Sequence, residues 1–291
     1  MKKVIVVGSL NMDLSIHAPY CPQGGETLSG SEFMASGGGK GANQAIAAGK
    51  FGANVIMCGC VGKDEFGEKI LQSFLNEKIS INFIRKVENI STGIAIILIT
   101  KGENRIVLNA GANAFLQKTD IDKVMSVSEK GDIFLTQLEN NVHAIGYGLK
   151  KAKEKGLFTI LNPAPANIEA KKYFKFVDLI IPNESELNIL GGTRQIMDAG
   201  VKTIVTTLGS RGYEITNSFG TTKYDCIKVN AVDTTGAGDT FCGVLAAELA
   251  NDKDLKIAAS FASRAASISC TKQGAAVSIP LRQEVLNYKI N

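Results

Sequence analysis

The stretch AVDTTGAGDTFCGVLAAEL, residues 231–249, predicts a glycine-rich turn that opens a helix. The apolar residues after the turn recur at i, i+3, i+4 and i+8, the spacing of one helix face: Phe241, Val244, Leu245 and Leu249. The first amides of a helix have no partner within it and lie at the positive end of its dipole, and glycines let an anion approach the backbone. The stretch therefore predicts a binding site for a phosphate or an oxyanion.

Asp239 places a carboxylate directly beside these amides. A carboxylate there repels a resting phosphate but can accept a proton from an attacking hydroxyl, which points to phosphoryl transfer. The alternative is an ordinary first-turn acid that the helix dipole favours, and GAGD alone leaves both interpretations open.

The composition indicates a globular, cytoplasmic protein. Of 291 residues, 45% are hydrophobic and 21% charged, which is enough for a large core. The net charge of +4 comes without a basic tract, so we expect no nucleic-acid partner. The six cysteines form no CxxC pair and most lie in apolar runs, which predicts reduced, mostly buried thiols. The first apolar run ends at Gly8, so we interpret it as a core strand rather than a signal peptide. No apolar run approaches the roughly 20 residues of a membrane span.

Apolar runs that alternate with helical stretches predict an α/β fold around a mostly parallel sheet. We expect sheet strands at 3–7, 54–60, 133–137, 158–161, 179–181 and 203–206, and a late hairpin formed by 211–216 and 221–224. We expect helices up to residue 51 and over 64–78, 256–269 and 282–287, besides the helix of the opening stretch. Without a repeat or a linker, the simplest account is a single domain over 1–291.

Two polar, β-rich segments, 14–35 and 91–109, interrupt this alternation. The first contains two prolines and a glycine turn, and the second contains a hairpin signal at 101–104. We expect the two segments to pair into a small β-sheet lid.

Polar residues gather where the predicted strands end. Asn11 and Asp13 follow the first strand, and ligands of open α/β sheets bind at the carboxyl ends of strands. Each segment alone fits ordinary turn chemistry, but the series predicts a binding edge. The other segments are Gln137–Glu139, Asn162–Pro165, Pro182–Glu186 and Thr207–Gly212.

A second glycine-rich segment, SGGGKGANQA at 36–45, opens another helix. Glycines there allow close backbone approach, and Asn43 and Lys40 add polar groups. The segment fails the Walker A pattern because Lys40 is followed by Gly41, and it fails the dinucleotide spacing. Tight helix packing is the alternative explanation.

Other chemistries lack their parts. Two histidines, His17 and His143, cannot supply a multi-histidine metal site. A hydrolase is not favoured, because Leu208 stands where a nucleophile elbow needs glycine. A lyase or dehydrogenase is not favoured either, because no Schiff-base lysine or cofactor fingerprint can be placed. A non-enzymatic binding protein stays open at this point.

Taken in order, these segments resemble the ribokinase family of sugar kinases, of the phosphofructokinase B type, from about residue 3 to about residue 280. The segments that carry the resemblance are Gly8–Asp13, Gly38–Ala45, Leu161–Ala166, Asn183–Glu186, Leu208–Gly212 and Asp233–Phe241. The resemblance implies a three-layer, Rossmann-like α/β fold with a β lid, and transfer of the ATP γ-phosphoryl group to the 5-hydroxyl of D-ribose. A related kinase for deoxyribose, fructose or a nucleoside is the alternative within the family, and a sugar-binding regulator without turnover is the alternative outside catalysis.

The resemblance also implies roles for individual residues. It implies that Asp239 is the catalytic base. It also implies that the amides of Gly236, Ala237 and Gly238 stabilise the negative charge on the transferred phosphoryl group. It assigns the sugar to Asn11, Asp13, Gly38, Gly39, Lys40, Asn43, Glu139 and Asp239. It assigns the nucleotide to Asn183, Thr207, Gly209, Ser210, Gly212, Gly238 and Ser263.

Cations and a partner chain are implied as well. Asn183 and Glu186 form an Asn-x-x-Glu pattern that acts near Mg²⁺ mainly through water. An activating K⁺ is expected at Asp233, Thr235, Ser269, Lys272, Gly274 and Ser278. The lid is expected to form a homodimer contact. Two departures concern the nucleotide side: the connection 187–202 is short, and Ser263 stands where histidine is common.

Overall fold

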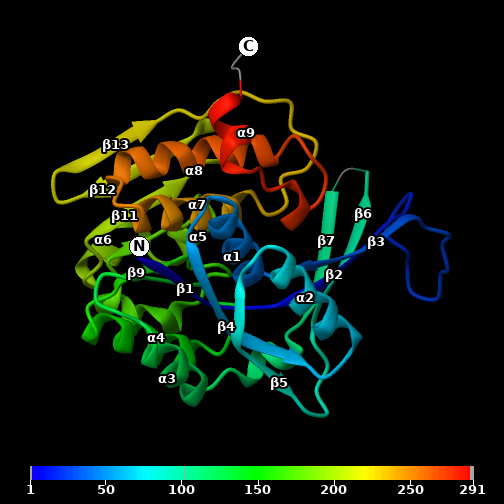
Figure 1. Ribbon diagram of the computed structural model, residues 1–291. Helices are drawn as coiled ribbons and strands as arrows, with labels where there is room; N and C mark the ends of the chain where they lie inside the picture. The colour runs from blue at the N-terminus through cyan, green and yellow to red at the C-terminus, as the bar shows by residue number, and fades with distance from the viewer. Residues whose placement is uncertain (1, 102, 289–291) are drawn as a thin grey trace.

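The computed structural model describes residues 2–101 and 103–288, which fold around a nine-stranded sheet (Figure 1). The strand order is β13-β12-β11-β10-β9-β8-β1-β4-β5, and every pair from β5 across to β11 is parallel. The strands are β1 (Lys3–Val7), β4 (Asn54–Gly62), β5 (Ser80–Val87), β8 (Ile133–Thr136), β9 (Phe158–Leu161), β10 (Leu179–Ile180), β11 (Thr203–Thr207), β12 (Tyr213–Asn217) and β13 (Gly220–Tyr224).

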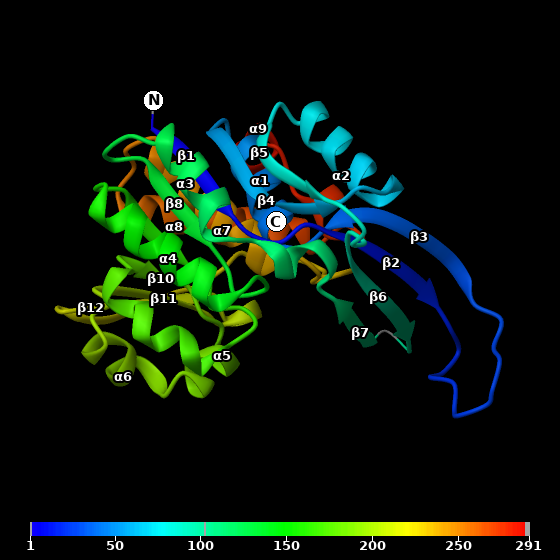
Figure 2. The ribbon, with the colours of Figure 1, turned by 90° about the horizontal axis from the view of Figure 1, so that it is seen from below.

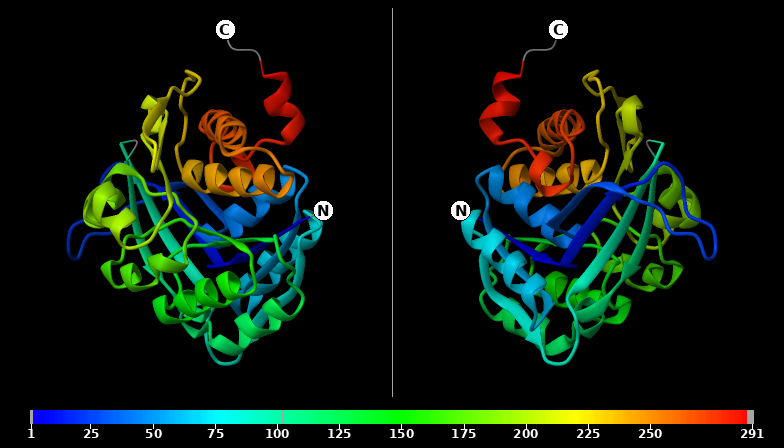
Figure 3. Two further views of the ribbon diagram at one scale, coloured as in Figure 1. Left: turned by 90° about the vertical axis from the view of Figure 1, so that its left-hand side faces the viewer. Right: turned by 90° about the vertical axis from the view of Figure 1, so that its right-hand side faces the viewer.

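Helices cover both faces of this sheet, as the two side views of Figure 3 show. Val4 and Val6 of β1 pack into the core beneath α1, α7 and α8, whereas Ile5 and Val7 pack into the core beside α3 and α4. A strand with two buried faces is apolar throughout, which is the pattern in the sequence. The helices are α1 (Lys40–Lys50), α2 (Glu65–Asn76), α3 (Lys118–Ser126), α4 (Val142–Glu154), α5 (Glu184–Ile189), α6 (Gly192–Asp198), α7 (Ala237–Ala250), α8 (Leu255–Ser269) and α9 (Arg282–Asn287). The predicted three-layer α/β architecture is confirmed.

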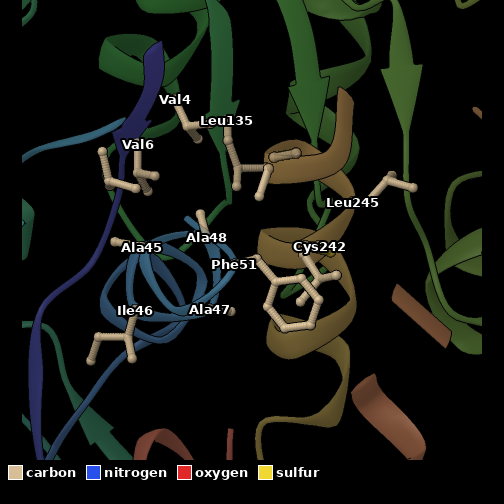
Figure 4. Packing of buried hydrophobic residues seen from close by; sticks show 14 of the residues in the cluster. Val4, Val6, Ala45, Ile46, Ala47, Ala48, Phe51, Leu135, Cys242 and Leu245 are labelled. Carbon is tan, nitrogen blue, oxygen red and sulfur yellow. The ribbon is translucent and has the colours of Figure 1, made fainter. Parts of the chain in front are cut away.

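Helices α1 and α7 pack closely side by side, and Figure 4 shows α1, with Ala47 and Ala48, next to α7, with Cys242 and Leu245. A Cβ built on Gly243 would stand 2.3 Å from the carbonyl oxygen of Gln44, so only glycine allows this approach. The contact brings the first turn of α7 against the first turns of α1. These are the two glycine-rich helix starts predicted from the sequence.

A second sheet, of order β3-β2-β6-β7, extends away from the main body (Figures 1 and 2). Its strands are β2 (Asn11–His17), β3 (Ser31–Gly38), β6 (Gly93–Thr100) and β7 (Glu103–Asn109). Because β2 runs parallel to β6, the two predicted β-rich segments do pair. The hairpin turn 101–104 includes residue 102, which lies outside the described residues.

Two predictions need correction. Asn11 and Asp13 are strand residues of β2 rather than turn residues, because β2 begins only a few residues after β1 ends. Strand β5 was not predicted. It lies at the edge of the main sheet, and its polar residues, among them Arg85 and Lys86, obscure the apolar pattern of a covered strand.

All six cysteines are free, as predicted, but the expected burial holds for only half of them. Cys58, Cys60 and Cys242 are buried, whereas Cys226 and Cys270 are partly exposed and Cys21 is exposed. Within the described residues, none of the helices has the length and apolarity that crossing a membrane requires.

Candidate active site

The candidate site lies at the carboxyl end of β1, where the order of strands reverses. The chain runs from β1 outward to β4 and β5 and then returns to β8 on the other side of β1. Such a switch point leaves a crevice between the loops that follow the two strands. Here the Ser9 hydroxyl donates a 2.5 Å hydrogen bond to Glu139 Oε2, and the backbone N–H of Lys40 donates to the same oxygen at 3.2 Å.

Asp239, in the first turn of α7, is 7% exposed and is held by two amide side chains of α1. Asn43 Nδ2 donates to Asp239 Oδ2 at 3.1 Å, and Gln44 Nε2 donates to Oδ1 at 2.9 Å. The charge of Asp239 raises the pKa of the nearby Lys40 ammonium above its ordinary value, although burial opposes this. Lys40 is therefore a cation beside the candidate base.

The turn before α7 adopts the conformation that its glycines predict. Gly236 has φ +75°, and a Cβ there would stand 2.9 Å from the side chain of Ala275. The N–H of Ala237 donates to the carbonyl of Thr234 at 3.2 Å. Among the described residues, the amides of Gly236 and Gly238 have no hydrogen-bond acceptor. In this conformation, these two of the three predicted amides are available to an anion.

The small sheet brings a further carboxylate close to Glu139 and Asp239. Asp13 on β2 lies against Gly38 on β3, where a Cβ would stand only 2.0 Å from Asp13 Oδ2. Burial, followed by the charges of Glu139 and Asp239, raises the pKa of Asp13 to about 7, and Lys40 opposes this. These contacts and charges bring the predicted sugar residues on β2, β3, α1 and the loop after β8 close together.

Two residues near the site were not assigned a role from the sequence. Asn113 accepts from the Leu10 N–H at 2.9 Å and donates to Asn11 Oδ1 at 2.7 Å, so it fixes the start of β2. Gln44 lies within the quoted glycine-rich motif, but its contact with Asp239 joins residues 195 positions apart. No local sequence signal marks either pairing.

Most of the residues that the resemblance assigns to nucleotide binding line a cavity of about 550 Å³ between the β11–β12 turn, α7 and α8. Six of the seven lie there: Thr207, Gly209, Ser210, Gly212, Gly238 and Ser263. Asn183 instead lines an adjoining cavity of about 200 Å³, together with Lys40, Glu186 and Asp239. Thr207 and Gly238 line both cavities, so the two spaces meet at the start of α7.

The Asn-x-x-Glu pattern forms a capping box at the start of α5. Asn183 Oδ1 accepts from the Glu186 N–H at 2.8 Å, and Glu186 Oε2 accepts from the Asn183 N–H at 2.9 Å. Burial raises the pKa of Glu186 despite this bond and the nearby Lys40. The cap holds a carboxylate in the same cavity as Asp239, and such oxygen donors suit Mg²⁺ bound through water.

The loops expected to hold a monovalent cation lie side by side. Asp233 accepts from Thr235 N and from Thr235 Oγ1 at 2.9 and 2.6 Å, and from Gly274 N at 2.9 Å. Burial acts to raise the pKa of Asp233, but these hydrogen bonds hold it below its ordinary value. Ser278 is buried nearby, and its hydroxyl donates to the carbonyl of Ala275 at 2.7 Å. A permanent carboxylate among hydroxyls and carbonyls fits a cation that prefers oxygen ligands.

The small sheet also contacts the loop that contains Asp233 and Thr235. Asn104 Nδ2 on β7 donates to Thr235 Oγ1 at 3.2 Å, which joins the small sheet to the loop that precedes the anion turn. The carbonyl of Ser269 accepts from Lys272 N at 3.1 Å, which closes the other loop. Asp233 and Gly274 are thus joined just before α7, and Asn183 and Glu186 are joined at the start of α5.

Comparison with known proteins agrees with this geometry. The sequence matches the pfkB family carbohydrate kinase model over residues 1–282. The ribokinase of Haemophilus influenzae is 37% identical, and the match covers 99% of this chain and 98% of that protein. The ribokinase structure from Thermotoga maritima superposes with a TM-score of 0.89 at 33% identity and 98% coverage of both chains. The Arabidopsis thaliana ribokinase complexed with ribose and ATP superposes with a TM-score of 0.85 at 29% identity, over 98% of this chain and 97% of that one.

Proposed function

The chain belongs to the pfkB family of carbohydrate kinases, and we propose that it is an enzyme that transfers the γ-phosphoryl group of ATP to the 5-hydroxyl of D-ribose, giving D-ribose 5-phosphate and ADP. The observation that carries the proposal is the position of Asp239. Its carboxylate lies in the smaller cavity, which adjoins the nucleotide cavity at Gly238, and its charge acts on Asp13 and Lys40, two of the predicted sugar residues. Full-length similarity to proteins named ribokinase supports ribose as the acceptor.

In this proposal Asp239 accepts the proton of the 5-hydroxyl while the hydroxyl oxygen bonds to phosphorus. The bond from phosphorus to the bridging oxygen breaks, and ADP leaves with its electron pair. A loose transition state needs alignment more than a strong base, and Asn43 and Gln44 provide that alignment by holding both carboxylate oxygens. The free amides of Gly236 and Gly238 and the ammonium of Lys40 stabilise the charge that develops.

In this proposal Asp13 and Glu139 bind sugar hydroxyls; the charge interaction between the two carboxylates and the hydrogen bond from the Lys40 N–H to Glu139 support this assignment. Asn43 contributes an acceptor of its own, because its buried Oδ1 has no partner among the described residues. A bound hydroxyl group would satisfy this oxygen. The sugar thus occupies the side of Asp239 opposite the nucleotide cavity.

Mg²⁺, which ATP-dependent kinases of this family use, neutralises phosphate charge when it is bound with ATP. Glu186 would hold it through water, with Asn183 maintaining the position of that carboxylate. Activation by K⁺ at the Asp233 loop, a homodimer through the small sheet and a cytoplasmic location complete the proposal. The oxygen-rich loop, the exposed apolar residues of the small sheet and the free thiols support them respectively.

A coupled assay of ADP release tests the proposal with D-ribose, 2-deoxy-D-ribose, D-fructose and nucleosides, each with and without K⁺. We expect the highest kcat/KM with D-ribose and a higher rate with K⁺. Preference for another acceptor would replace ribose by one of the related substrates. Absence of turnover with every acceptor would favour the sugar-binding regulator.

Asp239→Asn tests the proposed base. The substitution keeps the shape of the side chain but removes the proton acceptor, so we expect kcat to fall by about 10²–10⁴-fold. The assay is steady-state ADP release, with circular dichroism to establish that the variant is folded. Asp252→Asn, on the exposed turn after α7, serves as a matched control and should keep normal activity. Near-normal kcat in folded Asp239→Asn would refute the role of base.

A further inference from the structure

We propose that Gln44 is a positioning residue that fixes the direction of the Asp239 carboxylate and favours its ionised form. This inference rests on the proposed function, because it gives Asp239 the role of base. It extends that function by assigning a positioning role to Gln44, a side chain that is not expected to contact either substrate.

The buried amide of Gln44 uses both of its ends. Gln44 is 0% exposed, and its Nε2 donates to Asp239 Oδ1 at 2.9 Å and to Asn162 Oδ1 at 3.1 Å. Its Oε1 accepts from Gln137 Nε2 at 2.6 Å. The carboxylate therefore ends a chain of hydrogen bonds that runs from the loop after β8 through α1 to α7.

Hydrogen-bonding capacity fixes the direction of every amide in this chain. The ionised carboxylate of Asp239 only accepts, so the nitrogen of Gln44 must face it. The oxygen of Gln44 then faces Gln137, which must present its own nitrogen. Asn162 Nδ2 donates to the main-chain carbonyl of Ile181 at 2.9 Å, which turns its oxygen toward Gln44. The arrangement is self-consistent when Asp239 is ionised.

The helix contact leaves Gln44 little freedom. A Cβ on Gly243 of α7 would stand 2.3 Å from the carbonyl oxygen of Gln44, so the backbones of α1 and α7 are in direct contact here. Asp239 lies one helical turn before Gly243 on α7. The same close approach that packs the two helices therefore sets the 2.9 Å bond between Gln44 and Asp239.

Asn43 and Gln44 each donate a hydrogen bond to a different oxygen of the Asp239 carboxylate. Asn43 holds Oδ2 and keeps a free oxygen for a ligand, whereas the recorded hydrogen bonds of Gln44 are all to other residues of the buried chain. Loss of Gln44 should therefore change the base without removing a contact to sugar or ATP.

Gln44→Met tests this, because methionine fills a similar volume but donates no hydrogen bond. We expect kcat to fall about 10–100-fold with the KM for ATP within about 2-fold of wild type. Loss of a hydrogen-bond donor disfavours the ionised carboxylate, so the acid limb of the kcat profile at saturating ribose should move to higher pH. The charged and titratable groups near Asp239 stay the same in both proteins: Lys40 on α1, Asp13 on β2, Glu186 on α5 and Cys242 on α7.

Two further variants complete the series. Gln137→Met removes only the donor to Gln44 Oε1, so we expect a smaller shift in the same direction, and this keeps the test open if Gln44→Met does not fold. Gln72→Met, on the exposed face of α2, makes the same chemical change away from the site and should leave kcat and the pH profile unchanged.

A ¹³C NMR titration of the Asp239 carboxyl, assigned by the loss of its signal in Asp239→Asn, reads the shift without any substrate. A raised midpoint in Gln44→Met supports the inference even if the wild type phosphorylates no sugar, an outcome that would overturn only the proposed function. If the wild type turns over ribose, yet neither the acid limb nor the NMR midpoint moves in folded Gln44→Met and Gln137→Met, the inference is overturned.

Discussion

Asp13 is a carboxylate whose surroundings in this site disfavour its ionised form. Burial and the negative charges of Glu139 and Asp239 raise its pKa to about 7, with only Lys40 acting the other way. A sugar that donates hydroxyl groups to this carboxylate would favour its ionised form. The site therefore holds an unfavourable charge whose effect depends on pH.

The sign of that dependence follows from proton binding. The native-state pKa of Asp13, about 7, exceeds its ordinary value of 3.8. Between these values the native protein binds more protons than the unfolded chain, so this group lowers the free energy of unfolding as pH rises through that window. Below the window the group contributes no difference, and above it the loss is complete.

Asp13→Asn should remove this dependence. We expect the variant to gain stability relative to the wild type as pH rises from about 4 to about 7, and the gain to level off above that. Urea unfolding of both proteins at several pH values measures the difference, and ribose KM should rise in the variant because a proposed sugar ligand is lost. A stability difference that stays constant from pH 5 to pH 8 would contradict the assigned charge environment.

At this scale the sequence marks the candidate residues of the site better than the side chains that hold them. Asp239 and Lys40 could be selected as candidates because each stands beside a glycine-rich helix start, which is a local signal. The buried partners Gln44 and Asn113 could not, because their contacts join residues far apart in the chain. An amide side chain in a helix has no distinctive spacing until its partner is known.

Among the elements, β3 shows how a strand end is adapted to the site. Gly37 and Gly38 are successive strand residues, so a Cβ added to one would lie on the opposite face of the small sheet from a Cβ added to the other. A Cβ on Gly38 would stand 2.0 Å from Asp13 Oδ2, whereas the nearest atom to a Cβ on Gly37 would be Ser73 Oγ at 3.7 Å. The first glycine thus has room for a methyl group and the second does not.

Gly38→Ala should therefore displace the Asp13 carboxylate. We expect ribose KM to rise about 10-fold or more and kcat to change less, because Asp13 is proposed to bind the sugar and not the reacting proton. Steady-state kinetics at saturating ATP measures both constants. Gly37→Ala adds the same methyl group one residue earlier and should leave ribose KM within about 2-fold of wild type. Equal effects of the two substitutions would show that the crowding at Gly38 is not what positions Asp13.

Element prediction worked where the local signal is clear. Strands β1 and β9 and helix α9 have the predicted bounds, because both strands are mostly apolar and buried and the short helix begins after a proline-containing loop. Strand β5 escaped detection because an edge position allows polar residues. The early start of β2 could not be predicted either, since it depends on pairing with β6, more than 80 residues away.

For the whole molecule, the small sheet leaves part of an apolar row uncovered, at Ile96 and Val107, whereas Leu14 packs against the main core. The strand registers align Ala35, Leu14, Ile96 and Val107 across all four strands, so these side chains share one face. Ile96 and Val107 are 49% and 69% exposed. The opposite face carries Asp13 and borders the crevice, so an apolar row on the outer face is suited to a second copy of this chain.

A homodimer through this row predicts that Ile96→Lys dissociates it. A lysine at the centre of the row would place a charge within the apolar contact, so we expect the dimer Kd to rise at least about 100-fold. Sedimentation velocity over a concentration series measures this. Ile168→Lys is the matched control, because Ile168 is 62% exposed on the main body and lies outside the small sheet. Because the same sheet carries Asp13, the Ile96→Lys monomer should also show a higher ribose KM. Two lysine variants with the same sedimentation behaviour would place any self-association elsewhere on the molecule.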